Sequence, residues 1–227
     1  MSERFSPRLQ AVVFDLDGTL LDTASEFIEV VHALRAEHGL DRLDEDLIRS
    51  QVSNGARALV KLALGLAEGE PGFEEKRLRL LEIYRGVLGS SAAPYPGIPE
   101  LLCELEAAGV AWGISTNKPA ALTGVLLERV ALQPAPGSVV CADQVKNPKP
   151  HPEPLLLNCV QLGCEPRYTV YVGDHLRDIQ AGRGAGMYTI AAGYGYIVAG
   201  DDPTSWGADD LAASGPEVAA RVAAAFR

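Results

Sequence analysis

The stretch Ala11–Thr19, which reads AVVFDLDGT, joins a short apolar run to two aspartates and a glycine. Residues 11–14 predict a buried strand, because a continuous apolar run is typical of a parallel strand covered on both faces. Asp15 and Asp17 follow at the carboxyl end of this strand, where open parallel sheets bind ligands. Two carboxylates so close together repel each other, so we expect a cation or a shared proton beside them. A plain Asp–Gly turn is the alternative, although a single aspartate would suffice for it.

The rest of the chain alternates between short apolar runs and helical patterns. Further strands are predicted over 110–115, 139–141, 168–172 and 189–191, and helices over 99–108, 119–130, 152–162, 176–185 and 216–226. This alternation predicts an α/β fold, a Rossmann-like parallel sheet with helices on both faces. Residues 22–92 contain no strand pattern and look mostly helical, with a turn at 70–72. We therefore expect a core domain of residues 1–21 and 93–227, and an inserted α-helical cap domain of residues 22–92.

The composition is that of an acidic globular protein. The 227 residues include 30 acidic and 20 basic side chains, for a formal net charge of −10. Nucleic acids and anionic membranes attract basic surfaces, so neither is an expected partner. Residues 1–7 lack the apolar stretch of a signal peptide, and no apolar run approaches the roughly 18 residues of a membrane span. We expect a cytoplasmic protein whose four cysteines, which lack the paired spacing of a zinc site, are reduced.

Polar side chains also follow three of the later predicted strands. Thr116 comes at the end of the strand over 110–115, Lys149 lies in a proline-rich loop, and Asp174 and Asp178 follow the strand over 168–172. Carboxylates, a hydroxyl and an ammonium gathered at one edge of a sheet suit a phosphate group and Mg²⁺. Lys146 is the alternative to Lys149, but it lacks the two prolines that follow Lys149 at 150 and 152.

In this order, the four elements resemble the motifs of the haloacid dehalogenase-like hydrolase superfamily, in its phosphatase branch. The matching residues are Asp15-x-Asp17-Gly18-Thr19, Thr116, Lys149-Pro150-x-Pro152 and Gly173-Asp174-x-x-x-Asp178. Each motif alone is weak, but four in order with suitable strands are a strong signal. The resemblance spans essentially the whole chain, and the helical block falls where this family carries its cap. It implies a phosphoric monoester hydrolase that acts on a small molecule.

The resemblance implies a catalytic role for each of these motifs. Asp15 would be the nucleophile that attacks phosphorus and forms an aspartyl-phosphate. Asp17 would be the general acid for the leaving alkoxide and then the general base for the attacking water. Thr116 and Lys149 would bind the phosphoryl group, together with the neighbouring Asn117.

The same resemblance implies a Mg²⁺ cofactor. Its protein ligands would be the Asp15 carboxylate, the Asp17 backbone carbonyl and Asp174, with waters completing the shell. Asp178 would orient Lys149 or those waters, although its place in the first turn of a helix also suits simple stabilisation of the helix dipole. His175 stands where this branch often has Asp or Ser, and we expect an exposed histidine at the start of the helix.

The cap is expected to contact the rest of the substrate. Asn54, Gly55 and Arg57 lie at the predicted start of a cap helix, where backbone N–H groups and a guanidinium could bind an anionic or polar group. An ordinary helix cap with a solvated arginine is the alternative.

Other segments bear on the substrate. The overall layout resembles phosphoglycolate phosphatases, while segments 53–58, 145–147, 194–197 and 206–209 resemble the related N-acetylmuramate 6-phosphate phosphatases. We therefore prefer N-acetylmuramate 6-phosphate as the substrate, and phosphoglycolate stays open as the alternative. Tyr194, Tyr196 and Trp206 either line the mouth of the site or pack a long loop onto the core.

Two other functions would use a similar set of side chains. A sugar-phosphate mutase of the same superfamily would keep the phosphoryl group and return it to a bisphosphate. A phospho-aspartate receiver module, which is not an enzyme, also combines acidic residues with a threonine and a lysine, but such modules are shorter and carry no cap. The sequence leaves monomer and homodimer open as states of assembly.

Overall fold

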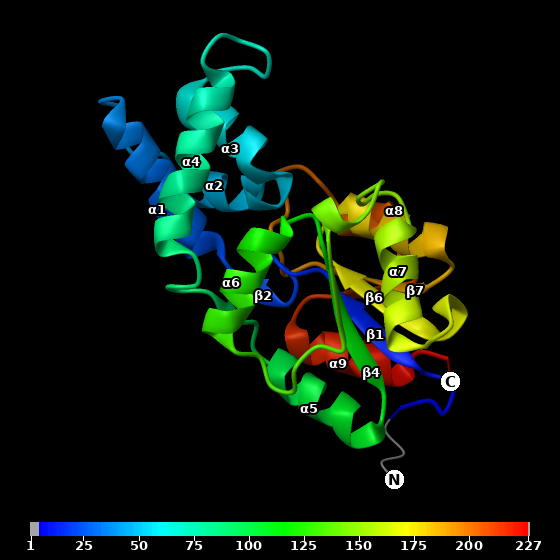
Figure 1. The fold of residues 1–227 in the computed structure, drawn as a ribbon. Coiled ribbons are helices and arrows are strands. Elements are labelled where there is room, and N and C mark those ends of the chain that lie inside the picture. Colours follow the sequence, from blue (N-terminus) through cyan, green and yellow to red (C-terminus); the bar gives the residue numbers. More distant parts are fainter. Residues whose placement is uncertain (1–4, 227) are drawn as a thin grey trace.

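A computed structural model describes residues 5–226 of the chain; residues 1–4 and 227, which the predicted core domain includes, lie outside the described residues. Within residues 5–226, six strands form one sheet in the order β5-β4-β1-β6-β7-β8, and all neighbouring strands are parallel (Figure 1). The strands are β1 (Ala11–Phe14), β4 (Ala111–Thr116), β5 (Ser138–Cys141), β6 (Thr169–Gly173), β7 (Tyr188–Ala192) and β8 (Asp210–Ala212). The predicted α/β sheet is confirmed, and the sequence pattern missed its short edge strand β8.

Strand β1 lies at the centre of the sheet. All four of its residues are fully buried, as the apolar run predicts. Phe14 lies opposite Ile114 of β4 and Val172 of β6, so these three strands run in register. Because parallel strands end at the same edge of a sheet, the polar residues that follow β1, β4 and β6 emerge side by side.

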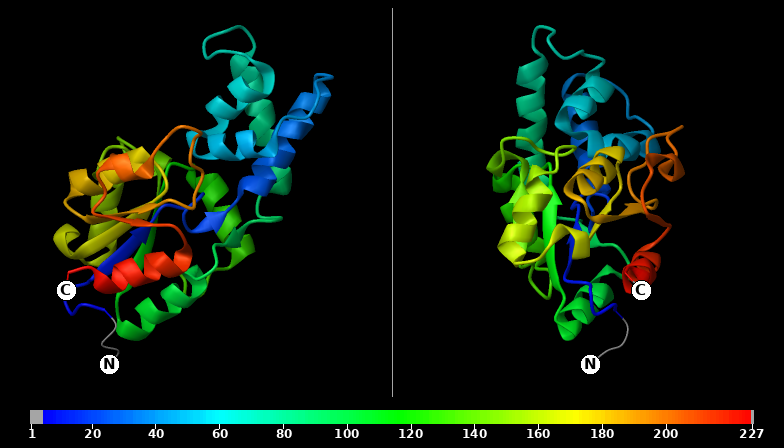
Figure 2. Two further views of the ribbon diagram at one scale, coloured as in Figure 1. Left: turned by 180° about the vertical axis from the view of Figure 1, so that it is seen from behind. Right: turned by 90° about the vertical axis from the view of Figure 1, so that its right-hand side faces the viewer.

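Helices cover both faces of the sheet (Figure 2). On one face lie α5 (Ile98–Ala108) and α9 (Gly215–Ala224), and on the other lie α7 (Glu153–Leu162) and α8 (Leu176–Ala185). Side chains of β1 alternate between these layers: Val12 and Phe14 belong to the larger apolar cluster, and Val13 packs with α7 and α8. Helix α6 (Ala120–Val130) follows β4 and contacts β5.

The segment between β1 and α5 builds a separate group of helices beside the sheet edge (Figure 1). It contains α1 (Ala24–Glu37), α2 (Glu45–Gln51), α3 (Gly55–Leu64) and α4 (Phe73–Val87), and α1 contacts the other three. A short antiparallel pair, β2 (Leu21–Asp22) and β3 (Ala93–Pro94), lies where the chain enters and leaves this group. In the part of the chain that the structure describes, no helix combines the length and apolar character needed to cross a bilayer.

Candidate active site

Gly18, in the turn after β1, allows two loops of the site to lie close together. Gly18 has a φ of +85°, a conformation that residues with a side chain rarely adopt. A Cβ at this position would lie 2.3 Å from Oδ2 of Asp174, so a side chain would collide with that carboxylate. The glycine therefore allows the loop after β6 to approach the loop after β1.

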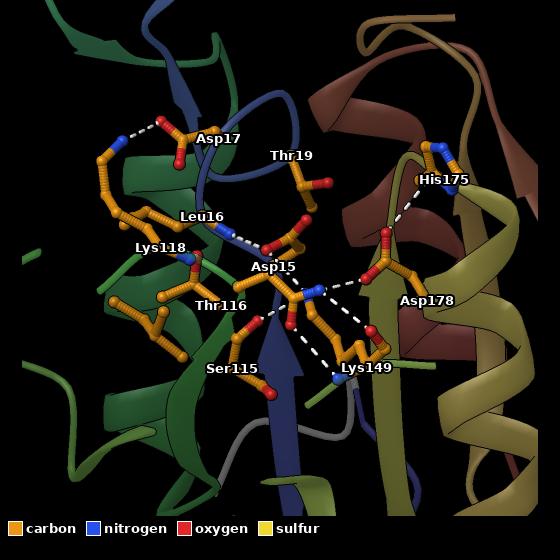
Figure 3. Close-up of polar contacts among 12 residues, drawn as sticks. Asp15, Leu16, Asp17, Thr19, Ser115, Thr116, Lys118, Lys149, His175 and Asp178 are labelled. Atoms are coloured by element: carbon orange, nitrogen blue, oxygen red, sulfur yellow. Dashed lines mark hydrogen bonds and ion pairs between the residues drawn. The ribbon is translucent and has the colours of Figure 1, made fainter. Parts of the chain in front are cut away.

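Lys149 lies buried between two carboxylates (Figure 3). Its Nζ is 2.8 Å from Oδ1 of Asp15 and 2.7 Å from Oδ1 of Asp178, and it also donates to the Ser115 carbonyl and the Tyr171 hydroxyl, both at 2.9 Å. Burial opposes the charged form of Lys149, but the two carboxylates outweigh this effect and raise its pKa. The ammonium is thus a fixed positive charge beside Asp15.

Three carboxylates meet at the end of the sheet. Asp15, Asp174 and Asp178 offer oxygens that lie within 4.8 Å of one another. Burial raises the pKa of Asp15 to about 7, and the charges of Asp178 and Asp174 add to this effect against the opposing influence of Lys149. Burial and Asp178 also raise the pKa of Asp174 to about 6. Buried carboxylates that oppose one another's ionisation fit a divalent cation that prefers oxygen ligands.

Asp174 is held by three donors. Thr19 Oγ1 donates to its Oδ1 at 3.1 Å, and the Tyr196 N–H donates to its Oδ2 at 2.9 Å. The third donor, at 3.1 Å from Oδ2, is the hydroxyl of Ser53. Ser53 belongs to the short 3₁₀ helix Val52–Asn54 (η1) of the helical group. That group therefore touches the carboxylate cluster directly.

The Asp17 carboxylate points away from this cluster and toward Lys118 (Figure 3). Its Oδ1 lies 2.6 Å from Lys118 Nζ and accepts a hydrogen bond from Thr23 Oγ1 at 2.7 Å. The buried Lys118 ammonium also lies 5.4 Å from the ring centre of Phe27 and 5.2 Å from that of Tyr84. Sequence reasoning missed Lys118, although it comes at the same strand end as the predicted threonine.

Thr116 and Asn117 also lie at this strand end and line the pocket above it. Oγ1 of Thr116 accepts the N–H of Lys118 at 3.1 Å, which leaves its hydroxyl proton for a ligand. The side chain of Asn117 bonds the backbone of Lys149 twice, through Nδ2 to the carbonyl at 2.9 Å and through Oδ1 to the N–H at 3.2 Å. The Asn117 amide therefore positions Lys149, and the substrate contact of this pocket residue stays a prediction.

A cavity of about 280 Å³ lies between the sheet edge and the helical group. Asp15, Asp17 and Lys149 line it, and Asn54 and Gly55 belong to its wall, as the sequence predicts for the cap contacts. The structure therefore brings the predicted catalytic residues and two of the three predicted cap residues to one pocket.

The structure does not bring Arg57, the third predicted cap residue, into this pocket. Its guanidinium pairs with Glu68 at 2.6 Å and Glu74 at 2.8 Å, and half of its side chain is exposed. The surface carboxylates attract the guanidinium outward, so the prediction of a substrate contact is not supported. Arg77 of α4 and Arg177 of α8, which no sequence motif indicated, line the cavity instead.

His175 caps helix α8. Its Nδ1 accepts the N–H of Arg177 at 3.1 Å, and its Nε2 lies 3.3 Å from Oδ1 of Asn54. The residue is half-buried, not exposed as expected from the sequence. Burial and then the Arg177 charge lower its pKa to about 4, so the ring is neutral near pH 7.

The aromatic residues of the late loop pack onto the core. Tyr194 donates to the Thr19 carbonyl at 2.8 Å and Tyr196 donates to Asp22 at 2.9 Å. Trp206 is buried against α8 and β7. In the described part of the chain none of these three side chains lines the pocket, which favours the packing interpretation.

Comparisons with known proteins agree with this geometry. The family model for haloacid dehalogenase-like hydrolases matches residues 12–192. The N-acetylmuramic acid 6-phosphate phosphatase of Pseudomonas aeruginosa is 48% identical over 202 residues, which cover 89% of each chain. A phosphoglycolate phosphatase of Xanthomonas campestris is 40% identical over 92% of this chain and 94% of its own.

A solved structure shares the fold at low sequence identity. The crystal structure of a predicted phosphoglycolate phosphatase from Haemophilus somnus superposes with a TM-score of 0.82 at 23% identity, over 93% of this chain and 96% of that one. The expected family is confirmed by the extent of the family match and by the identity of the relatives. The chain belongs to the haloacid dehalogenase-like hydrolase family.

Proposed function

We propose that the chain is a Mg²⁺-dependent phosphomonoesterase that acts through an aspartyl-phosphate on Asp15, with N-acetylmuramate 6-phosphate as its substrate. The main observation in support of phosphoryl transfer to Asp15 is the buried Lys149 ammonium, which lies 2.8 Å from the Asp15 carboxylate at the pocket floor. The higher identity of the relative with that substrate in its name supports the substrate.

Asp15 is proposed as the nucleophile. Its Oδ1 accepts the N–H of Leu16 at 2.7 Å and lies beside Lys149, so we assign the attack on phosphorus to Oδ2. The new bond joins this oxygen to phosphorus while the bond to the sugar alkoxide breaks. Lys149 and the Thr116 hydroxyl stabilise the charge on the phosphoryl oxygens during transfer.

Asp17 is proposed to move the protons. It protonates the leaving alkoxide, and its carboxylate then takes a proton from the water that hydrolyses the aspartyl-phosphate. Lys118 and Thr23 hold this carboxylate at the pocket, away from the metal-binding carboxylates.

The proposed metal ligands are the carboxylates of Asp15 and Asp174 and the backbone carbonyl of Asp17. When bound there, Mg²⁺ would screen the repulsion between the nucleophile and the phosphate. Asp178 uses Oδ1 for Lys149 and Tyr171 and accepts the His175 N–H with Oδ2. We therefore assign it the role of orienting Lys149.

Residues 22–92 are proposed to act as a cap domain over the pocket, because Ser53 and Asn54 contact core residues at its rim. Closure over the site would exclude water from the transferring group. The cytoplasmic location and the monomeric or homodimeric state stay predictions.

The decisive test is phosphate release from a panel of phosphorylated sugars and acids, with and without Mg²⁺. We expect Mg²⁺-dependent release from N-acetylmuramate 6-phosphate without an added bisphosphate, and none from the Asp15→Asn or Asp17→Asn variant. If kcat/KM is tenfold higher for phosphoglycolate, phosphoglycolate is the substrate instead. A requirement for an added bisphosphate would indicate a mutase. Full activity of the Asp15→Asn variant would contradict the assignment of Asp15 as the nucleophile.

A further inference from the structure

The pocket carries two arginines that the proposed reaction does not use. Arg177 lies in the first turn of α8, half-buried, and its Nη2 donates to Oδ1 of Asn54 at 3.2 Å. Among residues 5–226 no carboxylate forms an ion pair with this guanidinium. A half-buried cation that faces a pocket without a protein counter-charge is suited to an anionic ligand.

Arg77 approaches the same pocket from the helical group. It lies on one face of α4 with Leu81 and Tyr84, and all three line the cavity. Its Nε donates to Oε2 of Glu74 at 2.7 Å, which leaves the terminal N–H groups of the guanidinium for another acceptor. Glu74 is more than half exposed and is shared with Arg57, so it screens Arg77 only in part.

Both arginines lie beside the same segment, Asn54–Arg57. Arg177 donates to the first residue of this segment, and Arg77 shares Glu74 with the last one. The core and the helical group thus each contribute a guanidinium to this end of the pocket.

Arg77 lies far from the phosphate-binding floor, whereas Arg177 lies nearer to it, because the adjacent Asp178 contacts Lys149. The Tyr84 ring lies 5.2 Å from the Lys118 ammonium, which in turn lies 2.6 Å from Asp17. Arg77 precedes Tyr84 by two helical turns, which places it about 10 Å further along the axis of α4. Side chains of a helix lean toward its N-terminus, so Arg77 extends away from the floor.

We propose that Arg77 and Arg177 bind a carboxylate of the substrate beside Asn54–Arg57, while the phosphate lies at Asp15. This inference rests on the proposed function and narrows its substrate. In phosphoglycolate a single CH₂–O unit separates the carboxylate from the phosphate, so both groups stay near the floor. In N-acetylmuramate 6-phosphate the sugar ring lies between the phosphate and the lactyl carboxylate, which matches the separation between Arg77 and the pocket floor. Guanidinium groups suit this recognition because they bind carboxylates through paired hydrogen bonds.

The test compares two substrates that differ only in the lactyl group that carries this carboxylate. N-acetylglucosamine 6-phosphate lacks the lactyl ether of N-acetylmuramate 6-phosphate but keeps the ring, the acetamido group and the phosphate. The measured quantity is the ratio of kcat/KM for the two substrates in the wild type and in Arg77→Gln, Arg177→Gln and the double variant. Glutamine at 177 retains an N–H donor for Asn54, so its contact with the helical group can persist.

We expect the wild type to prefer the muramate, and each variant to lose at least about tenfold of this preference, mainly through KM. Arg85→Gln is the matched control, because Arg85 is an exposed residue of α4 outside the pocket, and it should keep the wild-type ratio. Unchanged ratios in both pocket variants, or a wild type without preference, would overturn the inference and leave the phosphatase proposal intact. If the wild type hydrolyses neither substrate, the proposed function fails and the inference with it.

Discussion

Replacement of Asp15 by asparagine is expected to stabilise the metal-free protein near and above neutral pH, although it removes the nucleophile. Asparagine keeps an oxygen for the Leu16 N–H and for Lys149, both of which contact Oδ1. It removes one negative charge from the cluster with Asp174 and Asp178. A site assembled to hold a cation is under electrostatic strain without it, so the loss of this charge relieves repulsion.

The size of the effect follows from the pKa of Asp15. This pKa rises from the ordinary value of 3.8 to about 7 in the folded protein, chiefly through burial. A carboxyl group with a raised pKa contributes stability that is fully present below its unfolded pKa and is lost as the pH rises through the folded value. A pKa difference of this size corresponds to about 4 kcal/mol. The advantage of the variant over the wild type should therefore grow by up to about 4 kcal/mol between about pH 4 and pH 8.

Urea unfolding in the presence of EDTA measures this difference. Trp112 and Trp206 are 4% and 6% exposed, so their fluorescence reports loss of the core, and circular dichroism checks that both probes follow one transition. Added Mg²⁺ should reverse the order, because only the ionised wild-type carboxylate gains a favourable interaction with the cation.

The reasoning would be refuted by a variant that is less stable than the wild type in EDTA at pH 8, or by a stability difference that does not vary with pH. Asp41→Asn is the matched control, since Asp41 is exposed and lies outside the carboxylate cluster. The stability of this control relative to the wild type should not show the same pH dependence.

Three further variants test individual contacts of the site. Lys118→Met removes the cation 2.6 Å from Asp17 and should lower kcat by about tenfold to a hundredfold in steady-state assays, part of what a positioned acid–base group contributes. Lys149→Met leaves two buried carboxylates without their cation and should reduce the free energy of unfolding in EDTA by about 3–5 kcal/mol. Ser53→Ala removes the hydrogen bond to Asp174 and should raise KM several-fold while kcat is retained, since one such bond contributes about 1 kcal/mol.

Lys61→Met serves as the control for both lysine variants, because Lys61 is an exposed residue of α3. An unchanged kcat for Lys118→Met would show that this lysine does not support Asp17. A Lys149→Met protein as stable as the wild type would contradict the balance of charges described for the cluster. Wild-type kinetics of Ser53→Ala would mean that the contact does not contribute to substrate binding.

The sequence predicts the sheet and the catalytic residues because both depend on local signals. The apolar run over 11–14 reads as a strand buried on both faces, and it is one. Asp15, Thr116 and Asp174 lie at or just beyond the ends of parallel strands, and parallel strands end at a common edge. Their meeting therefore follows from the parallel direction of the strands and needs no knowledge of side-chain packing. The edge strand β8 lacks such a signal, because it is short and only partly buried.

Contacts that depend on the packing of helices could not be predicted in this way. Arg57 of α3 and Arg77 of α4 both belong to the helical group, but of these two only Arg77 lines the pocket. The rotation of α3 and the acidic side chains of Glu68 and Glu74 direct Arg57 outward. Lys118 is different, since it lies three residues after the predicted strand end and its position alone could have indicated it.

By itself, the sequence determined the family, the parallel α/β sheet and the groups proposed to bind phosphate and metal. The tertiary structure alone decided how those groups are paired: Lys149 lies between Asp15 and Asp178, and Lys118 beside Asp17. It also decided which arginines face the pocket. The physical reason is that strand ends are set by local patterns of apolar and polar residues, whereas ion pairs between distant segments depend on how helices rotate and pack against the sheet.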